Sequence, residues 1–430
     1  MELYKKHISD LGRIVTGKTP RTSNAENYGG NIPFLTPSDD LSGKFAPQTV
    51  KTITEEGLSE VKNCLLPSKS VCVSCIGSDL GKVVITNEPT VTNQQINSII
   101  PTEENDTDFI YYLMTIVGKH LNFLSKTSTA VPIINKSTFA DFEIEVPSLE
   151  NQRRIAKILS SLDNKIEVNR RINDNLEQQA QALFKSWFVD FEPFRGQPFV
   201  ESELGMIPEG WRVGTLNDLG EIIGGSTPSK ANRHYYTDKG IAWLTPKDLS
   251  IANFKFTAKG ETDITQEGYN SCSTKLMPKG SVLFSSRAPI GYITIAKNEI
   301  CTNQGFKSVV PKIAGTAYIY YFLKASTKEI ENKATGSTFK EASGALMKSL
   351  PAIIPPISIL DSFENLMEPL FRKQEAMEDE SRRLAELRDT LLPRLMSGEL
   401  SMDGLKGQSA VSPGQHPGAK ATSPGQHPGV

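Results

Sequence analysis

The sequence predicts an α+β protein with two repeated globular mixed α/β domains, separated by two long antiparallel coiled-coil helices in a pseudo-twofold arrangement. Three observations support this prediction. Short motifs recur in order over most of the chain, a heptad pattern follows each copy, and strand-like runs alternate with helical ones inside each copy. The chain has 430 residues, which is enough for two domains of about 150 residues and the helices between them.

The repeat is visible as motifs that return 208 to 211 residues further along the chain. Leu11-Gly12-x-Ile14-x-x-Gly17-x-Thr19-Pro20 matches Leu219-Gly220-x-Ile222-x-x-Gly225-x-Thr227-Pro228. Thr92-Asn93-Gln94 likewise returns as Thr302-Asn303-Gln304. A spacing that drifts so little indicates two copies of one domain, which can present two similar but unequal surfaces to a two-sided target.

We place the two copies at residues 1–147 and 208–356. Residues 70–74 and 82–85 are predicted strands, because short runs rich in valine and isoleucine are bounded there by proline and glycine. Short buried helices are predicted at residues 108–114 and 318–323.

A heptad repeat follows the first copy. Apolar residues occupy most seam positions from Ile155 to Trp187, and Asn169 and Asn173 at the centre favour a helix whose register is fixed at some cost in stability. We predict one helix over residues 148–190, with Ser148 as its N-cap. At about 1.5 Å per residue, its length would be roughly 55–60 Å.

A second heptad-like pattern follows the second copy and predicts a helix over residues 357–398. Ser358-x-x-Asp361 fits a capping box at its start, and Pro369 is expected to kink or delay the helix. Two long seams in one chain most simply pair with each other, antiparallel, as a spacer between the domains. The alternative is that each helix only covers its own domain.

The remaining segments are a linker at residues 191–207 and a tail at residues 399–430, whose repeated Ser-Pro-Gly-Gln-His-Pro-Gly units predict disorder. The net charge of −2 and the pI near 6.3 are not typical of a protein that coats nucleic acid indiscriminately. No apolar run is long enough for a membrane span and no signal-peptide pattern opens the chain, so we expect a cytoplasmic protein without membrane contact.

Three short patterns resemble catalytic or metal sites, and we interpret each as structural. Residues Gly12–Thr19 match the phosphate-binding pattern GxxxxGK[ST], but proline and turn residues follow where a helix is needed. Cys72-x-x-Cys75 lacks a second pair of ligands, and Asp39, Asp40 and Glu60 are not all repeated in the second copy. We therefore predict no catalytic residues and no metal site in this chain.

Polar residues in duplicated loops remain as candidates for binding. Asn and Gln can pair with adenine edges and Arg with guanine, so these loops are candidate DNA-reading surfaces; the alternative for each single residue is turn chemistry. The candidates in the first copy are Lys18, Thr19, Arg21, Thr36, Ser38, Asn93, Gln94 and Gln95. Those in the second copy are Thr227, Thr245, Lys247, Ser286, Arg287, Asn303 and Gln304.

At this point the chain resembles the specificity subunit of a type I restriction–modification system. The resemblance rests on the duplicated Gly-x-Thr-Pro and Leu-Thr-Pro turns. It also rests on three longer stretches, which are Ala182–Phe194, Glu203–Trp211 and Leu387–Leu395. It covers residues 10 to about 400. The first copy departs from the family turn, with Ser74-Cys75-Ile76-Gly77 where the family usually has an Arg-Gly pair.

The resemblance implies two target recognition domains, each of which reads one half of an asymmetric, interrupted double-stranded DNA sequence. The helices would set the unread gap and carry two modification subunits, which are adenine methyltransferases using S-adenosylmethionine. Restriction subunits that use ATP and Mg²⁺ would join the same complex. The chain itself would hold no cofactor and would be a non-catalytic subunit.

Two questions stay open at the level of sequence. The aromatic residues Trp187, Phe188, Phe191 and Phe194 form either a subunit-docking surface or the local core between helix and linker. The rival functions are a coiled-coil scaffold or clamp with two partner-binding heads outside restriction–modification, and a free-standing enzyme built on the loop at residues 12–19.

Overall fold

The computed structural model describes residues 1–126, 134–251, 254–336 and 340–400. The chain divides into two compact units, Met1–Asn164 with Ala385–Val430, and Lys165–Leu384. Each unit holds one copy of the repeat and a part of both long helices. We call residues 1–147 the first head and residues 208–356 the second head. The predicted disorder of the tail falls on residues 401–430, which lie outside the described residues.

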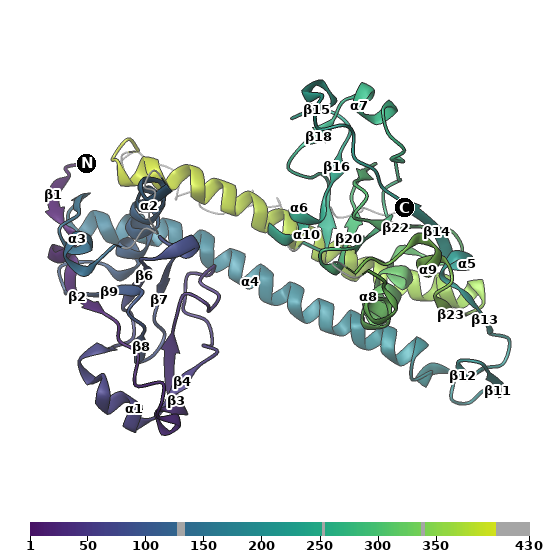
Figure 1. Cartoon of the computed structure of the whole chain (residues 1–430), viewed down its shortest axis with the longest axis horizontal. Helices are drawn as coiled ribbons and strands as arrows, with labels where there is room; N and C mark the ends of the chain where they lie inside the picture. Colours follow the sequence, from purple (N-terminus) through teal and green to yellow (C-terminus); the bar gives the residue numbers. More distant parts are fainter. Residues whose placement is uncertain (127–133, 252–253, 337–339, 401–430) are drawn as a thin grey trace, which may run out of the picture. The chain divides into compact units, whose positions relative to one another are not determined.

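The long helices are α4 (Leu149–Phe188) and α10 (Ile357–Met396), each of 40 residues (Figure 1). Ser148 stands at the N-cap position of α4, as predicted. The capping box predicted at Ser358 is wrong, because α10 has already begun there and the amides of Ile359 and Leu360 donate to the carbonyl of Pro356. Pro369 does not delay α10. It lies at an exposed position within the helix, and the buried residues Met367 and Phe371 on either side of it anchor the helix in the core.

The first unit contains two four-stranded sheets. One has the strand order β2-β9-β6-β7 and is antiparallel throughout; the other has the order β4-β3-β8-β5 and includes a parallel β3–β8 pair. The strands are β1 (Tyr4–His7), β2 (Gly12–Thr16), β3 (Tyr28–Leu35), β4 (Thr52–Ile53), β5 (Leu65–Leu66), β6 (Val71–Ser74), β7 (Val83–Ile85), β8 (Thr90–Thr92), β9 (Ile96–Pro101) and β10 (Glu143–Val146). The helices of this head are α1 (Glu55–Glu60), α2 (Thr107–Lys126) and α3 (Lys136–Ala140).

The second unit repeats this plan. Its main sheet has the order β14-β22-β19-β20-β17, and a parallel β16–β21 pair stands where the first unit has β3–β8. The strands are β11 (Phe199–Ser202), β12 (Gly205–Pro208), β13 (Arg212–Thr215), β14 (Gly220–Gly224), β15 (Tyr236–Thr237), β16 (Trp243–Leu244), β17 (Phe256–Thr257), β18 (Asp263–Ile264), β19 (Val282–Ser286), β20 (Ile290–Ala296), β21 (Cys301–Thr302), β22 (Lys307–Pro311) and β23 (Pro351–Ile354). The helices are α5 (Leu216–Leu219), α6 (Pro246–Ile251), α7 (Gln266–Asn270), α8 (Thr316–Lys333) and α9 (Gly344–Lys348).

The predicted strands at residues 70–74 and 82–85 are confirmed as β6 and β7, and the predicted short helices are parts of α2 and α8. The stretch at residues 191–207, predicted as a linker, includes most of the β11–β12 hairpin. No helix among the described residues is long and apolar enough to cross a membrane.

The main sheet of each head is buried on both faces, which explains its continuous apolar strands. In β6, Val71 and Val73 face a core shared with α2, whereas Cys72 between them faces the second sheet. In β19, Val282 and Phe284 face the core that includes α8, and Leu283 faces the opposite side. This alternation follows from the two-residue period of a strand.

Within each unit the parts of α4 and α10 pair antiparallel. In the second unit, buried Asn169 donates to Glu380 at 2.8 Å and Asn173 donates to the carbonyl of Gln374 at 3.2 Å, so contacts descend α10 as they ascend α4. In the first unit, residues near the start of α4 share a core with residues near the end of α10; these are Ile155, Ala156 and Leu159 with Leu392, Leu395 and Met396. The predicted antiparallel pairing is thus confirmed, with the two central asparagines in the seam.

Two of the rival motifs have a structural explanation. Residues Gly12–Thr16 form strand β2, so the backbone of the GxxxxGK[ST] match is extended where a phosphate site needs a loop at the start of a helix. Cys72 and Cys75 are buried within the first head, and Cys72 accepts a hydrogen bond from Ser98 at 3.4 Å. Burial raises the pKa of the Cys72 thiol to about 12 and also raises the pKa of Cys75.

This burial predicts that Cys72 does not react with iodoacetamide in the native protein. With a pKa of about 12, only about one Cys72 thiol in 10,000 is ionised at pH 8, and the thiolate is the reactive form. Labelling followed by peptide mass spectrometry should find Cys72 unmodified in native protein and modified after denaturation in urea. Rapid labelling of native Cys72, or protection that depends on zinc, would contradict the structural interpretation.

Candidate functional site

A hydrogen-bonded loop framework occurs in both heads. In the first, the hydroxyl of Thr19 donates to the side-chain carbonyl of Gln94 at 2.7 Å, and the hydroxyl of Tyr28 donates to the carbonyl of Pro20 at 2.8 Å. The first bond holds the Gly-x-Thr-Pro turn against the loop that follows β8, and the second holds it against the start of β3. The equivalent residues in the second head, with the same donors and acceptors, are Thr227, Gln304, Tyr236 and Pro228.

The glycine of this turn is required by close backbone approach. A Cβ atom at Gly17 would stand 2.2 Å from the carbonyl oxygen of Asn93, and one at Gly225 would stand 2.1 Å from that of Asn303. Any side chain would push the turn away from the end of β8 or β21. The glycine therefore has a packing role, not a phosphate-binding one.

An aspartate fixes the next loop in each head. Asp39 accepts bonds from the amide of Thr36 at 2.7 Å and from the amide of Val50 at 2.8 Å. Its two oxygens thus join two turns that are distant along the loop. In the second head Asp248 does the same with the amides of Thr245 and Glu261, at 2.7 and 2.9 Å.

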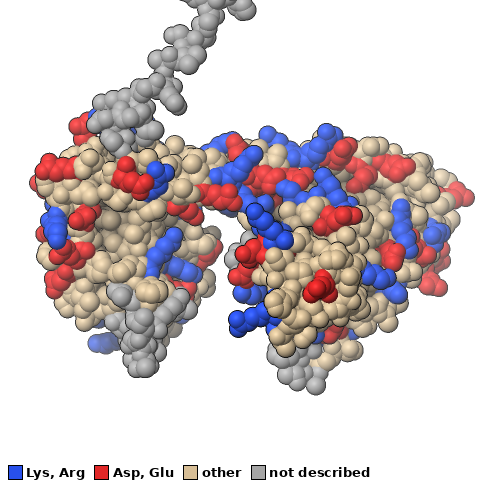
Figure 2. Space-filling model, turned by 90° about the horizontal axis from the view of Figure 1, so that it is seen from above, with Lys and Arg blue, Asp and Glu red and all other residues tan. Residues whose placement is uncertain are grey.

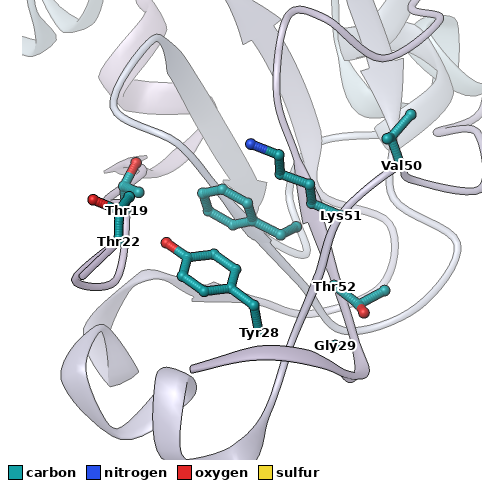
Figure 3. Close-up of a pocket in the computed structure, with 8 residues that line it drawn as sticks. Thr19, Thr22, Tyr28, Gly29, Val50, Lys51 and Thr52 are labelled. Carbon is teal, nitrogen blue, oxygen red and sulfur yellow. The ribbon is translucent and has the colours of Figure 1, made fainter. Parts of the chain in front are cut away.

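These loops enclose a cleft of about 440 Å³ in the first head. Thr19 and Thr22 form one side, Lys51 approaches from the opposite side, and the ring of Tyr28 lies between them (Figure 3). Phe34 also lines the cleft. Lys51 is exposed and has no ion-pair partner among the residues that the structure describes.

The second head has a cleft of about 710 Å³ at the equivalent place. Thr227, Tyr236 and Trp243 stand where the first head has Thr19, Tyr28 and Phe34. The charged lining differs, because Lys230, Lys247, Glu261 and Arg287 all border this cleft. Lys247 lies 3.1 Å from Glu261, and Arg287 lies 3.7 Å from Glu341, both in partly or fully exposed ion pairs that contribute little stability.

The two clefts therefore share a frame and differ in their linings. Thr22 is replaced by Lys230, Val50 by Glu261 and Lys51 by Thr262, at the spacing of the repeat. Aromatic rings, hydroxyls and cationic side chains together suit contact with bases and phosphates. Elsewhere the surface is mixed: on the face shown in Figure 2, basic and acidic side chains are intermingled.

The predicted DNA-reading residues fall into two groups. Those that line a cleft are Thr19 in the first head and Thr227, Thr245, Lys247, Arg287, Asn303 and Gln304 in the second. Two of the predicted residues, one in each head, also hold their loop in place. The side chain of Asn303 accepts a hydrogen bond from the amide of Gly305 at 2.8 Å, and that of Asn93 accepts one from the amide of Gln95 at 3.1 Å. Outside the cleft linings lie Lys18, Arg21, Thr36, Ser38, Asn93, Gln94, Gln95 and Ser286.

Some of the predicted DNA-reading residues form hydrogen bonds within the head. Buried Ser286 donates from its hydroxyl to the carbonyl of Gly305 at 3.1 Å, which leaves it no surface for a base. The amide of Arg21 donates to Glu60, and Lys18 is exposed. For Ser286, therefore, strand-end hydrogen bonding is the better interpretation.

The aromatic residues at the end of α4 pack inside the second unit. Phe188 and Phe194 are 7% and 5% exposed, and the ring of Phe188 lies 4.8 Å from those of Tyr318 and Phe363. Trp187 and Phe191 pack against the same core and are only partly exposed to solvent. Of the two alternatives left by the sequence, this burial favours a local core that joins α4 to the second head.

Two lysines that the sequence analysis did not select are buried between head and helices. The side chains of Lys44 and Lys255 are 9% and 7% exposed. Burial lowers the pKa of Lys255 to about 8, although Glu177 opposes this shift. A signal was present in the sequence, because Lys44-Phe45 recurs as Lys255-Phe256 at the spacing of the repeat.

Comparison with known proteins places this geometry in a family. The model of the type I restriction modification DNA specificity domain matches residues 2–178 and 208–375. The type I restriction enzyme MjaIX specificity subunit of Methanocaldococcus jannaschii is 30% identical, over 93% of this chain and 94% of that protein. The HindI specificity subunit of Haemophilus influenzae is 27% identical, over 86% of this chain and 94% of that protein.

A solved structure shares the fold. The crystal structure of the type I restriction–modification S subunit from M. genitalium has a TM-score of 0.56 at 17% identity, and the match covers 92% of this chain and 96% of that one. With two matched domains on one repeated framework, the chain belongs to the type I restriction–modification specificity subunit family.

Proposed function

We propose that each head reads one half of an asymmetric, interrupted sequence in double-stranded DNA, and that the cleft of each head is part of the reading surface. The observation that carries this proposal is the pair of equivalent clefts. Their framework residues are repeated, whereas the residues free to meet a ligand differ between the heads. Two readers of different half-sites need this combination of a common frame and unlike linings.

The charge of the chain fits reading within a larger complex. Its net charge of −2 supplies little of the phosphate neutralisation on which DNA affinity depends. Few cationic side chains border the clefts, and each has a defined position in the lining, such as Lys51 in the first head and Arg287 in the second. Partner subunits would then provide much of the general affinity, while this chain provides sequence preference.

We further propose that the paired helices set the length of the unread gap and carry two modification subunits, with restriction subunits in the same complex. S-adenosylmethionine, ATP and Mg²⁺ would bind to those partners, where adenine methylation and DNA cleavage would take place. In this proposal the chain directs chemistry and performs none of it. The relatives named above are themselves specificity subunits of restriction enzymes, which supports this division of roles.

We assign the contact with the modification subunit to an apolar stripe on α4. This stripe consists of Val168, which is exposed, and of Ile172 and Leu176, which are half-buried, and it is bordered by Arg171 and Asn175. Val168 is 49% exposed, so the stripe is open in the unit that contains it. Residues four apart share one helix face, which suits contact with an apolar helix of a partner.

The cleft proposal predicts half-site-specific defects. Arg287→Ala and Lys247→Ala should weaken discrimination in one half of the recognition sequence by about 1–3 kcal/mol per lost base contact. Lys51→Ala should affect only the other half. The measurement is single-molecule mapping of genomic adenine methylation after co-expression of each variant with the modification subunit.

The control is Lys5→Ala, which removes an exposed lysine whose only described ion pair is with Glu143 and should leave the methylated sequence unchanged. Loss of discrimination in both halves from Lys51→Ala alone would contradict the assignment of one cleft to one half-site. Absence of methylation with the unaltered chain and its modification subunit would favour the scaffold alternative.

The docking proposal predicts that Val168→Asp weakens assembly. A carboxylate in the apolar stripe would be desolvated in the complex without a partner, so the modification subunit should dissociate more readily. Size-exclusion chromatography of the co-expressed proteins measures this, with Gln178→Asp as a matched control at an exposed position of α4. Equal assembly of both variants would show that the stripe is not the docking surface.

A further inference from the structure

Each unit buries one lysine where its head meets the long helices. Lys44 and Lys255 occupy equivalent positions, 211 residues apart, and both side chains are almost inaccessible to solvent. Removing an ammonium group from water is costly unless its donors are satisfied. The partners of these two lysines must therefore satisfy the donors of both ammonium groups.

In the second unit the ammonium group of Lys255 has three oxygen partners. It donates to Glu177 on α4, to the hydroxyl of Tyr321 on α8 and to Gln374 on α10, each at 2.8 Å. All three N–H donors are thus used. The Phe371 ring of α10 lies 3.8 Å from the same nitrogen and adds a cation–π contact.

The backbone of the same segment is held as well. The amides of Lys255 and Phe256 donate to the two carboxylate oxygens of Glu378 on α10, at 2.9 and 3.1 Å. Lys324 on α8 donates to the second oxygen of Glu177 at 2.6 Å. The head is therefore tied to both helices of its unit through one polar cluster.

The first unit has a corresponding cluster with different members. Lys44 donates to Ser160 on α4 at 2.8 Å and pairs with Asp108 on α2 at 2.9 Å. The ring of Tyr112, which is equivalent to Tyr321, lies 5.0 Å from the ammonium group. The hydroxyl of Tyr112 donates to Asp163 on α4, and Asp163 also accepts from Arg388 on α10 at 2.7 Å.

We propose that Lys44 and Lys255 are positioning residues that fix the angle of each head on the helix pair, so that the subunit rejects DNA sites whose gap is one base pair too long or too short. This inference rests on the proposed function. One base pair changes the separation of two half-sites by about 3.4 Å and their relative rotation by about 34°. A head that can pivot follows such a change, whereas a head tied to both helices cannot.

The chemistry of the cluster suits this role better than a purely stabilising one. Buried ion networks contribute little net stability compared with apolar side chains of the same volume, whereas their hydrogen bonds depend strongly on distance and angle. The apolar core of each unit already attaches the head to the helices without a fixed set of hydrogen bonds. In this proposal, the hydrogen bonds of the lysine cluster fix the orientation of the head in that contact.

The test compares binding to duplexes with the native gap and with the gap changed by one base pair in either direction. The protein is the complex of the full chain with its modification subunits. Lys255→Met should reduce the preference for the native gap by about tenfold while the preferred bases in both half-sites stay the same. In this variant Glu177 keeps Lys324 and Gln374 as partners, so no carboxylate is left alone.

Two further variants make the outcome decisive. Tyr321→Phe removes one hydroxyl from the cluster and keeps the ring, so it should fold and show a smaller relaxation of the gap preference. Lys333→Gln removes an exposed ion pair elsewhere on α8 and should change nothing. If Lys255→Met does not fold, Tyr321→Phe decides the matter.

An unchanged gap preference in the folded variants, with or without a lower unfolding temperature, would overturn the inference. Failure of the unaltered complex to prefer any bipartite duplex would instead overturn the proposed function. These two results are distinct, because the second is seen before any variant is made.

Discussion

The antiparallel pairing of α4 with α10 is the contact on which both units depend. In each unit the core of the head is closed by side chains from both helices: Leu159 and Leu395 in the first, and Phe184 and Phe363 in the second. A head thus completes its core only where the two helices meet. Because apolar burial is the main favourable term in folding, the helix pair and the heads are stabilised by the same contacts.

The heads divide their polar residues between two tasks. Asp39 and Asp248 hold the loops by bonds to backbone amides, and the threonines and tyrosines around them repeat from one head to the other. The side chains that remain free border the clefts, and these differ between the heads. A surface can therefore change its preference without a change in the loops that support it.

Much of this architecture follows from the sequence, because it depends on patterns that are local or periodic. The strands β6 and β7 are recognisable from short runs rich in valine and isoleucine bounded by proline and glycine, and the asparagines of the helix seam from the heptad repeat. At the start of α10 only the predicted capping box was wrong, because Ser358 fits a capping pattern that a helix beginning at Ile357 does not use. A sequence can match the capping-box pattern although the helix does not use it.

The clefts and the lysine clusters depend on contacts between distant residues. Lys255 meets residues of α4, α8 and α10, all of which are distant from it along the chain. Likewise Lys51 and Thr22 border one cleft although they come from separate loops. This contact is not visible in the sequence, so neighbouring residues such as Lys18 and Arg21 were predicted instead. The sequence signal that the prediction did not use is recurrence, because Lys44-Phe45 returns as Lys255-Phe256 and Tyr111-Tyr112 returns as Tyr320-Tyr321.

The most direct test of the account changes the length of the helix pair and leaves the heads intact. One heptad is inserted into α4 after Asn164 and one into α10 after Leu384, which preserves the seam and adds about 10 Å to the pair. Methylation mapping should then find the same bases in both half-sites and a gap longer by about three base pairs, at about 3.4 Å each. An unchanged gap, or a change in the bases that are read, would contradict the account.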